Sequence, residues 1–144
     1  MGWIDPFAGN NSPAEYTNDL NPNTSAKEHL FAQEFIKKFN GVTFNGCILD
    51  PPYSPRQMKE CYDIVGYKPT MQDTQNVSLY MNVKNLLAPK IKPGGYVITC
   101  GWNSYGWGKR FGFEPIEILI VCHSSAHNDT ITVVEQKVNH VLEG

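Results

Sequence analysis

The sequence predicts an α/β domain whose sheet is mostly parallel and closes with an antiparallel hairpin. Three short apolar runs, each stopped by turn residues, predict buried strands at Trp3–Asp5, Gly46–Asp50 and Tyr96–Cys100. Helical patterns separate these runs, as expected of parallel strands joined by crossovers. Near the end of the chain, Glu114–Cys122 and Thr130–Glu135 flank a turn and predict the hairpin.

Length and composition predict one domain, residues 1–144. Of the 144 residues, 41% are hydrophobic and 12% aromatic, enough for one core. No apolar run reaches membrane-spanning length and no signal peptide opens the chain, so we expect a cytoplasmic protein with no membrane partner. The net charge of −2 gives no electrostatic sign of a nucleic-acid partner. Three cysteines in strand-like runs are expected to be reduced core residues: Cys47, Cys100 and Cys122.

The first helix is predicted to be reduced to a stub. Ser12–Glu15 has a capping-box pattern, but Tyr16–Leu20 follows at once and predicts the second strand. A parallel crossover normally needs about a dozen or more residues, so one face of the sheet beside the first two strands is expected to be thinly covered. We expect a second copy in a homo-oligomer, a partner subunit, or a helix from elsewhere in the chain to cover it.

Further helices are predicted from caps and apolar stripes. Ser25–Glu28 is a second capping box, and Ser54–Pro55 pairs a cap with a first-turn proline. With the apolar stripes that follow, these signals predict helices over residues 25–38, 54–65 and 73–88.

The stretch Ile48–Tyr53 is predicted to carry the functional site. Asp50 is the last residue of its strand, because the two prolines that follow lack the amide donor that a central strand needs. In an open α/β sheet, ligands bind just outside the carboxyl ends of the strands, so Asp50 and Tyr53 are expected at a binding site. The simpler alternative is a strand-terminating turn with a capping acid.

Asp50-Pro51-Pro52-Tyr53 resembles the Asp-Pro-Pro-Tyr motif of the amino-group DNA methyltransferases, and the chain looks most like the small, phage-type, adenine-specific members. The resemblance implies a class I (Rossmann-like) methyltransferase fold, S-adenosyl-L-methionine as cofactor and DNA as partner. It implies that Asp50 and the Pro51 carbonyl accept the two hydrogens of the exocyclic amine of adenine, while Tyr53 stacks on the extruded base. No metal is implied, because the sulfonium methyl is already an activated electrophile.

The resemblance also assigns a cofactor site. Asp5-Pro6-Phe7-Ala8-Gly9 is similar to the Asp-Pro-Phe-x-Gly cofactor motif of the same enzymes. Gly9 would let the backbone approach the methionine part of the cofactor, and Asp5 or a nearby backbone group would meet its amino end. Asp19, at the end of the second strand, would accept hydrogen bonds from ribose hydroxyls. The alternatives are an ordinary strand–turn for the glycine turn and an Asx-turn for Asp19.

Two segments are candidates for contacting the nucleic acid. The loop after the third predicted strand combines aromatic residues, glycines and two bases, so Trp102 and Tyr105 are expected to stack on a base while Lys109 and Arg110 hold phosphates. The alternative is a loop whose aromatic rings cap the edge of the core. Arg56 is a candidate phosphate contact or a solvated charge on the first turn of its helix.

The chain departs from the family pattern in two ways. No helix precedes the first predicted strand, although relatives often close one over the cofactor, and 144 residues leave no room for a separate target-recognition domain. We therefore keep two alternatives. One is a methyltransferase fold that binds the cofactor without transferring methyl. The other is an enzyme that methylates another amine or amide, in cytosine, RNA or a protein glutamine, although relatives that act on glutamine usually carry Asn where this chain has Asp50.

Overall fold

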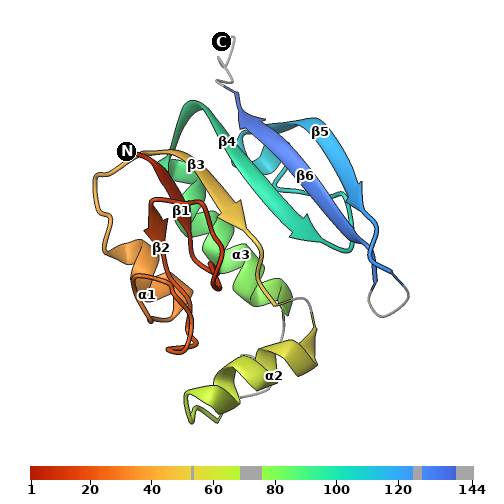
Figure 1. Cartoon of the computed structure of the whole chain (residues 1–144). Helices are drawn as coiled ribbons and strands as arrows, with labels where there is room; N and C mark the ends of the chain where they lie inside the picture. Colours follow the sequence, from red (N-terminus) through yellow and green to blue (C-terminus); the bar gives the residue numbers. More distant parts are fainter. Residues whose placement is uncertain (53, 69–75, 125–127, 139–144) are drawn as a thin grey trace.

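A computed structural model describes residues 1–52, 54–68, 76–124 and 128–138 (Figure 1). Within these residues the chain forms a six-stranded sheet in the order β2-β1-β3-β4-β6-β5. β2, β1, β3 and β4 run parallel to one another, while β6 pairs antiparallel with both β4 and β5, so the predicted sheet with its closing hairpin is confirmed. The strands are β1 (Trp3–Asp5), β2 (Tyr16–Thr17), β3 (Phe44–Leu49), β4 (Ile91–Gly101), β5 (Phe113–Val121) and β6 (Thr130–Lys137).

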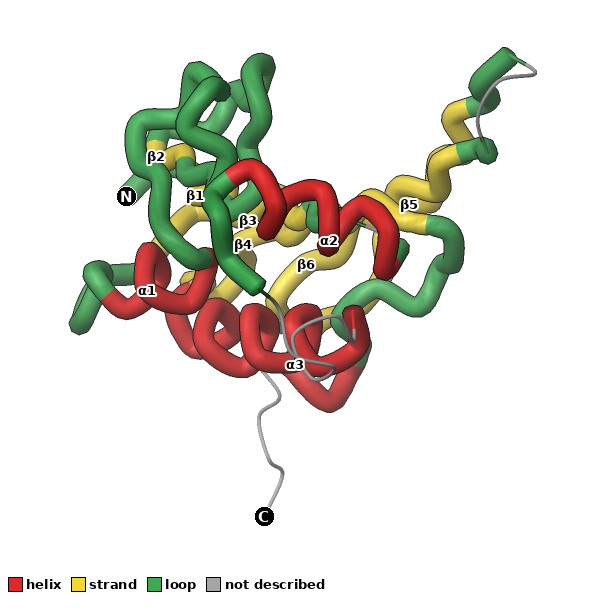
Figure 2. Tube along the Cα trace, turned by 90° about the horizontal axis from the view of Figure 1, so that it is seen from below, coloured by secondary structure: helices red, strands yellow, loops and turns green. Residues whose placement is uncertain are grey.

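The helices of the described part lie on one side and at one end of the sheet. Figure 2 shows α1 and α3 on the same side of the strands, whereas α2 crosses the end of the sheet toward which β3 points. None of these helices is long and apolar enough to cross a membrane. Their bounds are α1 (Ala32–Lys37), α2 (Pro55–Ile64) and α3 (Asn76–Leu87), with the short 3-10 turns η1 (Ala88–Lys90) and η2 (Lys109–Phe111).

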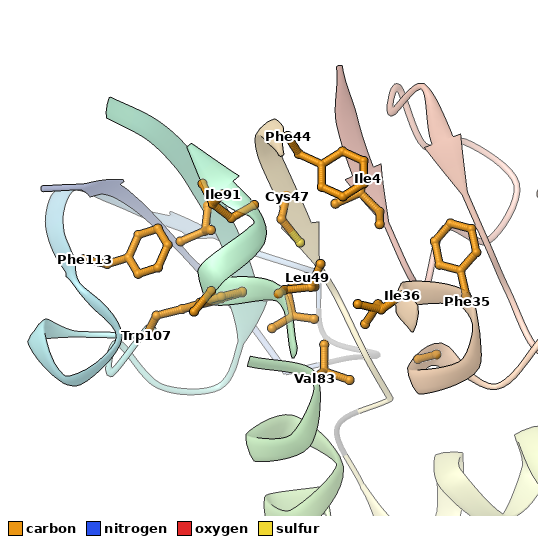
Figure 3. Close-up of a cluster of buried hydrophobic side chains, with 14 residues drawn as sticks. Ile4, Phe35, Ile36, Phe44, Cys47, Leu49, Val83, Ile91, Trp107 and Phe113 are labelled. Atoms are coloured by element: carbon orange, nitrogen blue, oxygen red, sulfur yellow. The ribbon is translucent and has the colours of Figure 1, made fainter. Parts of the chain in front are cut away.

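The core fills the space between the sheet and the helices α1 and α3. Cys47 and Leu49 of β3 and Val97 of β4 point to this side and are fully buried. Figure 3 shows side chains of the strands meeting those of the helices, with Leu49 near the centre and Val83 of α3 beside it. Full burial of such a side chain contributes about 1.5–3 kcal/mol relative to exposure. This one-sided core fixes which face of each central strand turns inward.

The opposite face of the sheet carries no helix within the described residues (Figure 2). Trp3 of β1 covers part of it, because its indole ring lies directly over Gly46, its register partner on β3. A Cβ atom added at Gly46 would lie 2.7 Å from three ring atoms. On the same face Ile48 and its register partner Ile98 are half-buried within the described residues, and a second subunit over this face stays a prediction.

Two of the predicted capping boxes are wrong. Residues 12–15 form no helix, and the Ser12 hydroxyl donates to Asp5 Oδ2 at 2.6 Å. Ser25 does not cap a helix either, since its amide donates to Asn10 Oδ1 at 2.9 Å and its hydroxyl to the Asn10 carbonyl at 2.7 Å. In both cases the serine hydroxyl donates to a distant segment, and the local bond that Ser12 Oγ accepts from the Ala14 amide at 3.3 Å is not followed by a helix.

The predicted helix over residues 25–38 begins only at Ala32, and the reason is a buried asparagine. Asn18 Nδ2 donates to the Leu30 carbonyl and the Leu30 amide donates to Asn18 Oδ1, each at 2.9 Å. The Glu28 amide also donates to the Thr17 carbonyl at 3.2 Å. These bonds hold residues 28–30 extended beside the end of β2, and β2 itself ends at Thr17 rather than at the predicted Leu20.

The expectation for the cysteines holds only in part. Cys47 is buried and Cys100 is half-buried, but Cys122 is exposed. Cys122 follows β5, which pairs with β6 alone and is the outermost strand of the sheet, so its end has no neighbour on the far side.

Candidate active site

Three carboxylates gather where β1, β2 and β3 end. Asp5 is the last residue of β1, Asp19 lies just beyond β2, and Asp50 directly follows β3. Because β1 is a parallel neighbour of both other strands, their carboxyl ends meet at one edge of the sheet. Ligands of open α/β sheets bind at such an edge. Asp5, Asp19 and Asp50 therefore lie at the same edge of the sheet, while their roles toward a ligand stay predictions.

Asp5 organises the turn that follows β1. Its side chain is only 3% exposed, and its oxygens accept hydrogen bonds from the Phe7 amide at 3.0 Å and the Ser12 hydroxyl at 2.6 Å. Burial raises the pKa of Asp5, and the negative charge of Asp19 adds to the rise. The two Asp5 oxygens therefore already bind groups of the turn, and a contact of Asp5 with a cofactor amino group stays a prediction.

Asp19 joins the turn after β1 to the loop after β2. Its Oδ2 accepts a hydrogen bond from the Gly9 amide at 2.9 Å, and its Oδ1 accepts one from the Asn21 amide at 2.9 Å. The second bond is the Asx-turn that was the alternative for this residue, and the ribose role stays a prediction. Gly9 has φ +55° and no protein atom within 4 Å of an added Cβ. Glycine is thus favoured there by the left-handed backbone rather than by crowding from the protein.

A cavity of about 410 Å³ opens at this edge, and we call it the Asp50 cavity. It brings together five of the predicted site residues: Phe7, Asp19, Asp50, Pro51 and Pro52. Its volume is within the range of about 300–1,000 Å³ typical of small-molecule sites.

The other predicted site residues near these strands lie outside the Asp50 cavity. Asp5 and Pro6 are buried beside it, while Ala8 and Gly9 line a separate hollow of about 150 Å³. Tyr53, the predicted stacking residue, lies outside the described residues. The cofactor turn is therefore split, with Phe7 facing one hollow and Gly9 the other.

Helix α2 forms one wall of the Asp50 cavity. It begins with a complete capping box, in which Gln57 N–H donates to Ser54 Oγ at 3.2 Å and Ser54 N–H donates to Gln57 Oε1 at 3.1 Å. Met58 and Tyr62, one turn apart, are 2% and 8% exposed and line the cavity. Sequence reasoning predicted this helix but not its place over the site, although the Met58–Tyr62 spacing marks an inward face.

An aromatic cluster holds the end of α2 in place. The ring centroids of Phe31 and Tyr62 are 6.2 Å apart, and those of Phe31 and Tyr67 are 5.5 Å apart. Phe31 immediately precedes α1, so the cluster ties α2 to the layer of helices under the sheet. Such pairs contribute about 0.5–1.5 kcal/mol beyond their buried area.

Asp50 has a pKa suited to proton exchange near neutrality. Asp50 is an exposed residue, but partial burial of its carboxyl raises its pKa, and the charge of Asp5 raises the pKa further, to about 6. At neutral pH the group is mainly ionised and can accept a hydrogen bond from an amine. A titrating carboxyl with a shifted pKa in a cleft is typical of functional sites.

The predicted nucleic-acid residues fall into two groups. Trp102 and Tyr105 are 50% and 85% exposed and line a second cavity of about 350 Å³ beside β4. Lys109 and Arg110 are exposed on η2 and do not line it. Arg56 is exposed, and its Nε forms an ion pair with Glu60 at 2.8 Å, as a solvated charge would, while its contact with a phosphate stays a prediction.

Sequence reasoning missed a buried carboxylate. Glu135 of β6 is 1% exposed and accepts hydrogen bonds from the amides of Trp107 at 2.6 Å and Gly108 at 2.8 Å. Trp107 itself is 4% exposed and belongs to the core, so the core-capping alternative is correct for that ring. The available signal was a lone acid on the inward face of an apolar strand, two residues from Val133.

No protein-family model and no curated protein sequence matches this chain. Solved structures do match it. An rRNA methylase from Streptococcus thermophilus aligns with 96% of this chain and 88% of its own at a TM-score of 0.58 and 9% identity. TrmN from Thermus thermophilus aligns with 96% of this chain and 44% of its own at a TM-score of 0.59 and 16% identity.

A third match is SMU.1697c from Streptococcus mutans, solved in complex with SAH, which aligns with 94% of this chain and 88% of its own at a TM-score of 0.51 and 11% identity. The chain has a class I methyltransferase fold. Identities this low establish the fold alone. Within this methyltransferase fold, the Asp50 cavity lies at the carboxyl edge of the parallel strands.

Proposed function

We propose that the chain is an S-adenosylmethionine-dependent methyltransferase that acts on the exocyclic amino group of adenine in DNA. One observation carries the proposal: Asp50-Pro51-Pro52 directly follows β3 and lines a cavity together with Asp19 and Phe7. The resemblance to the amino-group DNA methyltransferases and the SAH complex of a structural neighbour support the cofactor.

The residues of the Asp50 cavity fit S-adenosylmethionine. The carboxylates of Asp19 and Asp50 give the cavity a negative wall, which complements the positive sulfonium and ammonium groups of the cofactor. Phe7 and Met58 add an apolar surface. When bound, the cofactor supplies an activated methyl group. Asp19 is the candidate ribose ligand, and α2 excludes water from the opposite wall.

Asp50 and Pro51 would orient the acceptor. An exocyclic amine conjugated to its ring is a poor nucleophile, and acceptors placed on its two hydrogens favour lone-pair density on nitrogen. The Asp50 carboxylate and the Pro51 carbonyl provide two such acceptors on a stiff turn, because proline fixes the backbone. Tyr53 is proposed to stack on the base, which must first leave the duplex.

RNA is the second candidate substrate, because one structural neighbour is an rRNA methylase. In either case Trp102 and Tyr105 are proposed to meet the base, and Arg56, Lys109 and Arg110 to meet phosphates. A cofactor-binding chain without methyl transfer is the remaining alternative.

Transfer of labelled methyl from S-adenosylmethionine to unmethylated DNA and to RNA tests the proposal. Digestion of labelled DNA should release N6-methyladenine. Label in RNA only would move the proposal to RNA, and cofactor binding without label in either polymer would support the non-catalytic alternative.

A further inference from the structure

A second cavity, of about 350 Å³, lies between α3, the end of β4 and the loop that follows β4, and we call it the loop cavity. Its walls include Tyr80 and Lys84 of α3, Cys100 of β4, and Trp102 and Tyr105 of the loop. Three of these five side chains are aromatic. A pocket of this size that combines aromatic walls with the polar side chains of Lys84, Thr99 and Asn103 suits a planar ring with polar edges.

The loop cavity lies next to Asp50, although no residue lines both cavities. Leu49 of β3 is the register partner of Thr99 on β4, so the next residues along the two strands, Asp50 and Cys100, stand side by side. Asp50 lines the first cavity and Cys100 lines the second. The pKa values of Tyr80 and Cys100 are raised mainly by burial and also by the charge of Asp50. Asp50 therefore stands between the two cavities.

The wall of the loop cavity is fixed from behind by Glu135. Its carboxylate accepts hydrogen bonds from the amides of Trp107 and Gly108, and the Trp107 indole N–H donates to Thr99 Oγ1 at 3.0 Å. Lys84 Nζ donates to the Gly106 carbonyl at 2.6 Å. A Cβ at Gly106 would overlap the Glu135 carboxylate, and the residue has φ +56°. The base of the loop is therefore tied to both α3 and β6.

Resting on the proposed function, we propose that the loop cavity receives the nucleobase whose amine is methylated, and that Glu135 is a positioning residue for its aromatic wall. This arrangement places donor and acceptor in separate cavities with Asp50 between them. A base in the loop cavity would present its amine to Asp50, and Trp102 and Tyr105 would supply stacking surfaces. In this arrangement residues of α3 and β6 form part of the base site together with Asp50.

Filling the loop cavity tests the proposal. Met81 of α3 lines the cavity and is half-buried, whereas the adjacent Asn82 is exposed and does not line it. Met81→Trp should abolish binding of deoxyadenosine, and the matched control Asn82→Trp should leave it intact. Binding is followed in the presence of saturating S-adenosylhomocysteine by the NMR signal of the Trp102 indole N–H, with circular dichroism to confirm folding.

A second variant tests the loop cavity without adding a larger side chain to it. Tyr105 is 85% exposed, so Tyr105→Ala leaves the core untouched and should weaken deoxyadenosine binding about tenfold, the equivalent of about 1.4 kcal/mol of stacking. Glu135→Gln should lower kcat while the dissociation constant of S-adenosylhomocysteine stays unchanged. A purely structural role for Glu135 would lower thermal stability without this split.

The outcomes separate the two proposals. If the native chain methylates DNA but Met81→Trp and Asn82→Trp behave alike, the loop cavity is not the base site and the proposed function stands. If deoxyadenosine shifts the Trp102 signal but no DNA or RNA is methylated, the cavity assignment stands and the function fails. An unmoved Trp102 signal up to the solubility limit of deoxyadenosine overturns the cavity assignment.

Discussion

The carboxylates of Asp5 and Asp50 interact across the neighbouring ends of β1 and β3. Burial, followed by the charge of Asp5, raises the pKa of Asp50 to about 6. The ionised carboxylate is a stronger hydrogen-bond acceptor for an amine than the protonated carboxyl, so methyl transfer should rise with pH through about 6 and level off near neutrality. The pH profile of kcat/KM measures this midpoint.

Asp5→Asn should move that midpoint to lower pH. Like charges raise each other's carboxyl pKa, so removing the Asp5 charge lowers the pKa of Asp50. The Ser12 hydroxyl can turn to donate elsewhere, and circular dichroism would show whether the turn survives. A midpoint that stays in place would assign the titration to a group other than Asp50.

Asp19→Asn should weaken cofactor binding more than tenfold, or more than about 1.4 kcal/mol. The change removes a negative charge from the Asp50 cavity and one of the two oxygens that organise Gly9 and Asn21. Calorimetric titration with S-adenosylhomocysteine measures the effect. Asp63→Asn is the matched control, since Asp63 is exposed on α2 and does not line the cavity. Equal affinities for the two variants would remove Asp19 from the cofactor site.

Tyr62→Ala should loosen α2 without unfolding the sheet. The ring is 8% exposed and packs on Phe31, so its loss costs about 3–5 kcal/mol of local packing. Faster amide exchange confined to α2 and weaker S-adenosylhomocysteine binding are expected together. Faster exchange in α2 with unchanged binding would show that the helix does not close the cofactor site.

Gly46→Ala should destabilise the fold by about 1–3 kcal/mol, because the new methyl overlaps the Trp3 ring. Trp3→Leu removes the overlapping ring atoms, so the double variant should recover part of the loss. Chemical denaturation of the native chain, both single variants and the double variant measures this coupling. Strict additivity would mean that Trp3 does not pack on Gly46 in solution.

The sequence predicted those features of the fold that depend on local chemistry. The strand before the prolines ends at Leu49, one residue before the predicted Asp50, and Ser54 caps α2 as the Ser54–Pro55 pair predicts. The capping boxes predicted at Ser12 and Ser25 failed, because Asp5 and Asn10 accept the serine hydroxyls from distant segments. A local pattern contains no information about such acceptors.

The site was predictable at its strand ends but not at its walls. The acids follow from where β1, β2 and β3 stop, and this is why Asp19 and Asp50 were found. The position of α2 over the Asp50 cavity depends on aromatic contacts between Tyr62 and Phe31, far apart in the chain. The role of Glu135 was not predicted, because it binds backbone amides of another segment and every residue type except proline has such an amide.

Asp50→Asn provides a folded control for the central claim. A raised carboxyl pKa means that the native state binds the proton more tightly than the unfolded state, so Asp50 lowers stability as pH rises from about 4 to about 6. The neutral amide removes that cost. The variant should therefore be at least as stable as the native chain at neutral pH. The gain in the free energy of unfolding should be less than about 1 kcal/mol, because the side chain is partly exposed.

The most direct measurement compares labelled methyl transfer from S-adenosylmethionine to unmethylated DNA by the native chain and by Asp50→Asn, with S-adenosylhomocysteine affinity measured for both. We predict label in N6-methyladenine for the native chain, a loss of about a hundredfold or more for the variant, and similar affinities. Equal transfer by the two chains would contradict the role of Asp50, and absence of label in the native chain despite intact cofactor binding would contradict DNA methylation.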